Sequence, residues 1–229
     1  MREIIFDTET TGLSPAGGDR LVEIGCIELV NRFPSGRIFH RYFNPERDMP
    51  SEAFAVHGLS VEFLKDKPRF AEIADELAGF IEDAPLVAHN ALFDLSFLNA
   101  ELERCAKQIV ARDRLVDTLM LARRRHPAGP NRLDDLCARY GIDNSRRTKH
   151  GALLDAELLA EVYIELIGGR QASLILVDTG RAQAATGRKR SAAPRRPTPI
   201  ASRLTETEQQ AHAQFIGRLG DKAVWLDYR

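Results

Sequence analysis

This sequence has little of several features that mark particular classes of protein. Its three cysteines, Cys26, Cys105 and Cys137, are odd in number and widely spaced, which suits neither a disulfide framework nor a zinc site. We therefore expect buried, reduced thiols and a cytoplasmic location. No apolar run is long enough to span a bilayer, and the charged start Met1-Arg2-Glu3 is not followed by a signal-peptide core, so we expect no membrane partner.

Strong charge of either sign is also missing. The 229 residues carry 32 Lys and Arg against 33 Asp and Glu, a net charge of -1. Any nucleic-acid partner therefore has to be held by a local patch or by a metal ion. Hydrophobic residues make up 44% of the chain, which is enough for a sizeable core. The length allows one large domain with an appendage, or two small domains.

The sequence does have a short apolar run that leads directly into two carboxylates, between Ile4 and Gly12. Such a run, ended by a turn signal, indicates a buried strand. Side chains alternate along a strand, so Asp7 and Glu9 project to one side and Thr8 to the other. Two neighbouring carboxylates repel unless a cation lies between them, and Mg²⁺ and Mn²⁺ prefer oxygen ligands. The alternative is a strand end at which both carboxylates are solvated.

Periodicity and turn residues predict the elements around this strand. Further strands are expected at 21–30, 37–43, 85–88 and 115–116, the first two joined as a hairpin by the turn formers at 31–36. Helices are expected at 50–58, 73–81, 92–107, 118–125, 132–139 and 152–167. Asp117 and Asn131 are placed to cap the helices that follow them, and Gly141 is placed to end one. This order predicts an α/β fold, a mixed sheet with helices on its faces.

The composition changes towards the C-terminus. Residues 178–200 are rich in Ala, Gly, Pro, Thr and Arg, which predicts a flexible basic linker, with a nucleic-acid contact as the alternative. Thr205 and Glu208 then match a capping box. An apolar stripe follows at Ala211, Phe215, Ile216 and Leu219. The only tryptophan, Trp225, lies beyond this stripe, far from any core that it could complete locally.

Three further side chains are candidates for chemistry. Asp94 follows the strand expected at 85–88, and Asp155 lies near a helix start, where each is also an ordinary carboxylate favoured by the helix dipole. On a continuous helix, His150 would point away from Asp155. Gly151 lets the backbone bend, so His150 can fold back over Asp155 and act as a general base, since histidine titrates near neutral pH. The alternative is an ordinary surface histidine.

Taken together, three segments resemble the motifs of the DEDDh 3′–5′ exonuclease family. They are, in the family's order, Asp7-Thr8-Glu9, Asn90-x-x-x-Asp94 and His150-x-x-x-x-Asp155. Proofreading members that serve bacterial replicative polymerases also resemble this chain between the motifs, at Glu52 to Gly58, Asn131 to Cys137 and Asp143 to Arg147. The resemblance extends from the N-terminus to about Gly169.

The resemblance implies a ribonuclease H-like fold and a two-metal hydrolysis that releases 5′-mononucleotides from single-stranded or frayed DNA 3′ ends. It implies His150 as the general base and two Mg²⁺ or Mn²⁺ ions per active site, held by Asp7, Glu9, Asp94 and Asp155. Substrate contacts are implied for Asp7, Glu9, Asp155, Glu52 and His57. Contacts with the last base, or equally core positions, are expected at Thr10, Leu13 and Phe93.

The resemblance also implies three regions: an exonuclease domain at 1–170, a linker at 171–200 and a segment at 201–229 that binds the polymerase catalytic subunit. A free-standing nuclease that trims RNA or single-stranded DNA has no need of the last two. An inactive scaffold is disfavoured because all five catalytic positions are present. Gln171 to Leu176 is similar to the short motif with which bacterial replication proteins bind the sliding clamp. The alternative for that stretch is a final strand or turn packed on the domain.

Overall fold

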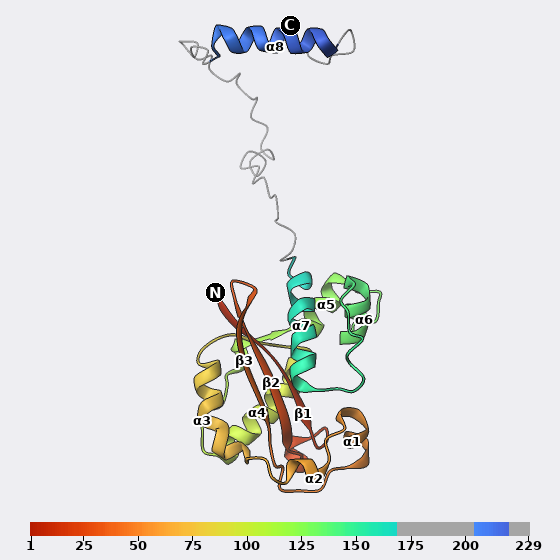
Figure 1. The fold of residues 1–229 in the computed structure, drawn as a ribbon. Coiled ribbons are helices and arrows are strands. Elements are labelled where there is room, and N and C mark those ends of the chain that lie inside the picture. Colours follow the sequence, from red (N-terminus) through yellow and green to blue (C-terminus); the bar gives the residue numbers. More distant parts are fainter. Residues whose placement is uncertain (169–203, 220–229) are drawn as a thin grey trace, which may run out of the picture. The chain divides into compact units, whose positions relative to one another are not determined.

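The computed structural model describes residues 1–168 and, as a separate unit, residues 204–219. Residues 1–168 form a five-stranded sheet flanked by helices (Figure 1). The strands lie in the order β3-β2-β1-β4-β5. Their bounds are Arg2–Thr10 for β1, Leu21–Val30 for β2, Phe33–Tyr42 for β3, Leu86–Ala88 for β4 and Leu115–Asp117 for β5.

Strand β1 lies at the centre of the sheet. It pairs antiparallel with β2 and parallel with β4, while β3 continues the antiparallel half and β5 the parallel half. The mixed sheet expected from the order of elements is therefore confirmed. Because β1 is covered on both faces, its apolar residues run consecutively, as in a strand of a parallel sheet.

The β2–β3 hairpin turns earlier than the sequence suggested. Asn31 and Arg32 both have positive φ, 51° and 70°, which is typical of a two-residue hairpin turn. Strand β3 therefore begins at Phe33, and the prediction of a loop at 31–36 was wrong. The turn formers are accommodated inside the strand, where the pairing register shifts and Gly36 adopts a φ of 87°.

Seven helices flank the sheet within residues 1–168 (Figure 1). They are α1 (Ser51–His57), α2 (Val61–Leu64), α3 (Phe70–Ile81), α4 (Ala91–Arg104), α5 (Thr118–Arg125), α6 (Leu133–Tyr140) and α7 (Ala152–Leu166). Alternation along β1 divides the core into two. Ile4 and Phe6 pack with α3 and α4, whereas Ile5 packs with α6 and α7.

Of the two caps expected from the sequence, one is present. The Asp117 carboxylate accepts hydrogen bonds from the first-turn N–H groups of α5 at 2.9 and 3.3 Å. The prediction for Asn131 was wrong, because α6 begins only at Leu133. The Asn131 amide instead donates to backbone carbonyls of the preceding loop, including that of Gly129 at 2.9 Å. Gly141 ends α6 with a φ of 67°, as expected.

A glycine on β2 brings the start of α7 against the sheet. A Cβ atom added at Gly25 would lie 2.4 Å from the backbone N and Cα of Leu153, in the first turn of α7. Only a residue without a side chain permits this approach. Gly25 pairs with Asp7 of β1, so the close contact places the first turn of α7 beside the carboxylates of β1.

The second described unit contains helix α8 (Glu206–Leu219). The expected capping box is present: the Thr205 N–H donates to the Glu208 carboxylate at 2.8 Å, and the Glu208 N–H donates to Thr205 Oγ1 at 3.3 Å. Phe215 and Leu219 of the apolar stripe are 54% and 44% exposed. Trp225, the linker and the 171–176 stretch lie outside the described residues. In the two described parts, no helix is long and apolar enough to cross a membrane.

Candidate active site

Three of the expected carboxylates lie at the C-terminal end of β1, two on the strand itself and one on α4. Asp7 and Glu9 share the face of Ile5, towards α7, and Thr8 points the other way, as expected. The Thr8 hydroxyl donates to Asp94 Oδ1 at 2.7 Å, in the first turn of α4. The buried Asp94 carboxylate is thereby fixed next to β1, although it belongs to the other layer of helices.

The third motif adds a carboxylate and a histidine from the start of α7. Asp155 lies in the first turn of α7 and is buried. His150 lies in the loop just before that helix, and its Nδ1 is 3.2 Å from Asp155 Oδ2. The fold-back expected from Gly151 is therefore present in the geometry. The His150 side chain is 48% exposed, so it remains accessible to solvent and to a substrate.

The structure gathers some of the predicted residues more tightly than others. Ligand atoms of Glu9, His150 and Asp155 all lie within 4.8 Å of one another, as a metal site requires. Asp7 and Asp94 are not part of that tight group. Both are electrostatic neighbours of the group, because Asp94 raises the pKa of Glu9, while Glu9 and Asp155 raise the pKa of Asp7.

Burial and mutual repulsion disturb the titration of this cluster. Burial, with the nearby carboxylates, raises the pKa of Glu9 to about 8 and that of Asp7 well above its usual range. Burial also raises the pKa of Asp94 to about 7. At Asp155 burial acts in the same direction, but hydrogen bonds from Arg147 and His150 outweigh it and lower the pKa. Near neutral pH, protons and one guanidinium thus offset much of the negative charge.

These residues fit a hard divalent cation. The donors are carboxylate oxygens, which Mg²⁺ and Mn²⁺ prefer, and one imidazole. The pKa values of Asp7 and Glu9 are raised, so the cluster contains too little positive charge to balance its carboxylates. A bound metal would displace protons from the carboxyl groups, because only the ionised form is a ligand.

The cluster lies in a cleft of about 1110 Å³ that also contains the residues expected to hold a nucleotide. Glu52 and His57, both on α1, line it. His57 Nδ1 accepts a hydrogen bond from the N–H of Leu59 at 3.0 Å. Its Nε2 is buried and has no hydrogen-bond partner in the described residues. Burial lowers the pKa of His57, so that the ring is a neutral hydrogen-bonding group at pH 7.

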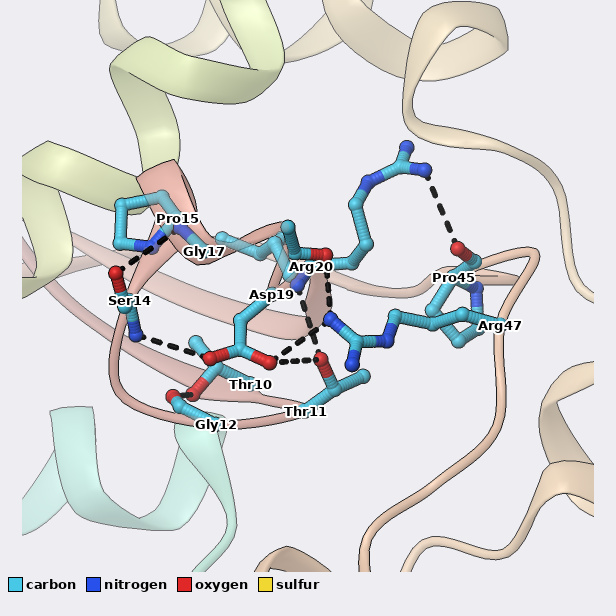
Figure 2. A network of polar contacts seen from close by, with 12 residues as sticks. Thr10, Thr11, Gly12, Ser14, Pro15, Gly17, Asp19, Arg20, Pro45 and Arg47 are labelled. Atoms are coloured by element: carbon cyan, nitrogen blue, oxygen red, sulfur yellow. Dashed lines mark hydrogen bonds and ion pairs between the residues drawn. The ribbon is translucent and has the colours of Figure 1, made fainter.

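A well-braced loop after β1 forms one rim of the cleft (Figure 2). The Asp19 carboxylate accepts hydrogen bonds from the Ser14 N–H at 3.0 Å and from Arg47 Nη1 at 2.8 Å. A Cβ atom at Gly12 would lie 2.4 Å from that carboxylate, so a larger residue there would displace the Asp19 side chain. Leu13 projects from the loop with 84% of its surface exposed. Thr10 and Phe93, the other expected base contacts, also line the cleft.

Three cationic residues of the cleft were not assigned a role from the sequence. Arg147 contacts Asp155 directly, and Arg123 and Arg132 line the wall formed by α5 and the start of α6. Within the described residues, Arg123 and Arg132 form no ion pair. An arginine in a polar loop is usually a solvated residue. The segment that ends at Arg147 resembles the family, but the place of all three arginines in the cleft is visible only in the tertiary structure.

Comparison with known proteins assigns the chain to a family. A sequence model of the exonuclease family matches residues 4–163, a range that contains all five predicted catalytic positions. The chain belongs to this family. The exonuclease is 49% identical over 224 residues to DNA polymerase III subunit epsilon of Rickettsia conorii, with 96% of each chain covered. It is 43% identical over 239 residues to the Escherichia coli epsilon subunit, with 98% of this chain and 97% of the other covered.

Solved structures agree with this family at the level of the fold. Exonuclease I matches with a TM-score of 0.64 and 20% identity, over 74% of this chain and 41% of that one. The nuclease domain of 3′hExo, a DEDDh family member bound to rAMP, matches with a TM-score of 0.63 and 14% identity, over 73% and 92%. The expected ribonuclease H-like fold and the expected class, a 3′–5′ exonuclease of the epsilon type, are confirmed. The roles of single residues stay predictions.

Proposed function

We propose that this exonuclease removes mispaired 3′-terminal nucleotides by metal-dependent hydrolysis in the cleft at the end of β1. One observation carries the proposal: carboxylates from β1, α4 and α7, three separate elements, converge on one cleft together with a loop histidine. A structural ion-pair network would contain matching cations, whereas here three carboxyl groups have raised pKa values. Membership of the exonuclease family supports the interpretation of this cluster as a nuclease active site.

Each residue then has a definite task in the reaction. Asp7, Glu9, Asp94 and Asp155 would hold two Mg²⁺ or Mn²⁺ ions, which when bound supply an acidified water and offset charge on the attacking and leaving oxygens. His150 takes the proton of the attacking water at a ring nitrogen, since it lies beside the ligands and is half exposed. The product is a 5′-mononucleotide.

The terminal nucleotide would be held on the α1 side of the cleft. His57 lines this side of the cleft, and its imidazole is the group that would hydrogen-bond a sugar hydroxyl. Glu52 lies on the same helix and lines the same side. The exposed Leu13 can pack against the last base from the braced loop.

The strand that leads to this nucleotide would follow the basic wall. Arg123 and Arg132 are exposed, lie on the cleft and have no carboxylate partner in the described residues, so both are available to phosphates. Phosphate contacts of this kind position a strand without reading its sequence. This local patch supplies the attraction for DNA that a net charge of -1 does not.

The partners of the exonuclease follow from the remainder of the chain. We propose that 1–170 is the catalytic domain, that 171–200 is a linker and that 201–229 binds the polymerase catalytic subunit in the cytoplasm. The apolar stripe of α8 supports the last point, because an amphipathic helix needs a surface on which to bury such a stripe. Gln171 to Leu176 would bind the sliding clamp, and a tether of this kind adds avidity to a weak peptide contact.

A digestion of labelled DNA tests the proposed reaction. A single-stranded oligonucleotide labelled at its 5′ end should shorten one nucleotide at a time in Mg²⁺ or Mn²⁺ and stay intact in EDTA. A 3′-terminal mismatch on a duplex should be removed faster than a paired end, because the cleft admits a single strand. Hydrolysis that continues in EDTA, or that releases internal fragments first, would falsify the proposal.

A further inference from the structure

Arg147 is the most heavily engaged side chain of the candidate active site. Its Nε donates to Asp155 Oδ1 at 2.6 Å and its Nη2 to Asp155 Oδ2 at 2.8 Å, a two-pronged ion pair. Its Nη1 lies 2.7 Å from Asp134 Oδ2, and Nη2 donates to His150 Nδ1, also at 2.7 Å. The Arg147 side chain is only 7% exposed, whereas its neighbour Arg146 is 75% exposed.

This geometry conflicts with the proposed function in one respect. The guanidinium uses both oxygens of Asp155, and Asp155 is one of the carboxylates that would hold a metal. A guanidinium and a divalent cation at the same carboxylate repel each other and compete for its lone pairs. The same guanidinium also occupies His150 Nδ1, which lies 2.7 Å from Arg147 Nη2 and 3.2 Å from Asp155 Oδ2.

We propose that Arg147 is an internal counter-ion of Asp155 that competes with a metal ion for this carboxylate and releases it when the metal ion binds. This inference rests on the proposed function. Asp134 lies on α6 and is 56% exposed, so its ion pair with Arg147 Nη1 persists at the rim of the cleft and retains the displaced guanidinium. The same displacement withdraws Nη2 from His150, so that metal entry also frees the general base.

The alternative role for Arg147 is that of a permanent support which orients Asp155 for the metal. The two roles predict opposite changes in metal affinity when the guanidinium is removed. Loss of a permanent support weakens metal binding, typically by 10- to 100-fold for residues that hold a ligand. Loss of a competitor tightens it, and charged hydrogen bonds of this strength correspond to roughly a tenfold change.

The test compares Arg147→Gln with Arg146→Gln, which removes an adjacent exposed arginine. Mn²⁺ affinity is measured on the full chain by calorimetry and by electron paramagnetic resonance of the free ion. Arg147→Gln should tighten Mn²⁺ binding about tenfold, and Arg146→Gln should leave it unchanged. Unchanged or weaker Mn²⁺ binding by Arg147→Gln overturns the proposal.

Thermal unfolding supplies a second readout that shows whether the variant folds. In EDTA, Arg147→Gln should lower the Tm, because Asp155 is left buried without its cation. At saturating Mn²⁺ the difference from wild type should disappear, whereas a deficit that persists there also contradicts the proposal. If wild type itself binds no Mn²⁺ and shows no metal-dependent hydrolysis, the proposed function fails. If wild type binds Mn²⁺ and the variant binds it less tightly, only the proposal for Arg147 fails.

Discussion

The geometry around His150 is compatible with two roles, metal ligand and general base. Its Nδ1 lies 3.2 Å from Asp155 Oδ2, and it shares a 4.8 Å neighbourhood with Glu9, so distance alone suits a metal ligand. Its position on a loop and its 48% exposure suit a base that must meet water and move. The buried carboxylates already offer enough oxygen ligands, and we therefore assign His150 to proton transfer.

His150→Ala should lower the turnover number by roughly 10²–10⁴ while Mn²⁺ affinity stays within about twofold of wild type, because the ligands remain. Thr148→Ala, an exposed change in the same loop, is the matched control and should alter neither quantity. Turnover is measured at saturating substrate, and affinity by calorimetry. A loss of Mn²⁺ affinity that parallels the loss of rate would show that His150 is a ligand.

At the scale of elements, the site depends on how closely α7 approaches the sheet. Asp155 reaches β1 because the first turn of α7 lies directly on Gly25 of β2. The geometry of the cluster therefore depends on a residue outside the five motif positions. The sequence did not predict this contact, because a glycine within a strand can mark a bulge, a bend or the close approach of another backbone.

Gly25→Ala should destabilise the domain by about 1–3 kcal/mol, because a Cβ atom there forces α7 away from the sheet. Hydrolysis should fall in addition, since Asp155 moves with the helix. Gly79→Ala is the matched control: nothing lies within 4 Å of its Cβ position on α3, so it should stabilise the helix by about 0.5–1 kcal/mol. Urea unfolding measures both, and equal stability of the two variants would contradict the close-contact argument.

The sequence of the C-terminal segment and the apolar stripe of α8 together lead to a prediction about polymerase binding. Trp225→Ala should abolish co-purification with the polymerase catalytic subunit, because tryptophan is enriched among the residues that dominate interfaces. Hydrolysis of free single-stranded DNA should be unchanged, since residues 1–168 contain the whole cleft. Retention of the partner by the variant would place the docking surface elsewhere.

At the scale of the whole molecule, the sequence predicted the features that residues close together in the chain determine. The bounds of β2 and α5 match the expected ones, because a largely apolar run and the Asp117 cap define them. The five motif positions predicted from the resemblance all line one cleft. Asn131 was wrongly expected as a cap because its amide stabilises the previous loop instead, a choice that depends on tertiary structure.

The part of the site that the sequence did not predict is its positive charge. Arg147 ends one of the segments that resemble the family, but no role was assigned to it, and the exposed Arg146 beside it is the same residue type. Only the return of α7 over the sheet buries Arg147 between Asp155 and Asp134. Ion pairs between residues on different elements depend on the packing of those elements, which no short window of sequence contains.

The central claim is that the carboxylates of β1 bind metal and make the chain an exonuclease. It is tested most directly by replacing Asp7 with Asn and Glu9 with Gln, which keeps the side-chain shapes and removes the charges. Mn²⁺ binding and 3′–5′ hydrolysis should both disappear, while the Tm in EDTA should not fall, because mutual repulsion in the cluster is relieved. Asp66→Asn with Glu103→Gln, two exposed positions, is the control. A folded Asp7→Asn, Glu9→Gln protein that still digests DNA at the wild-type rate would contradict the account.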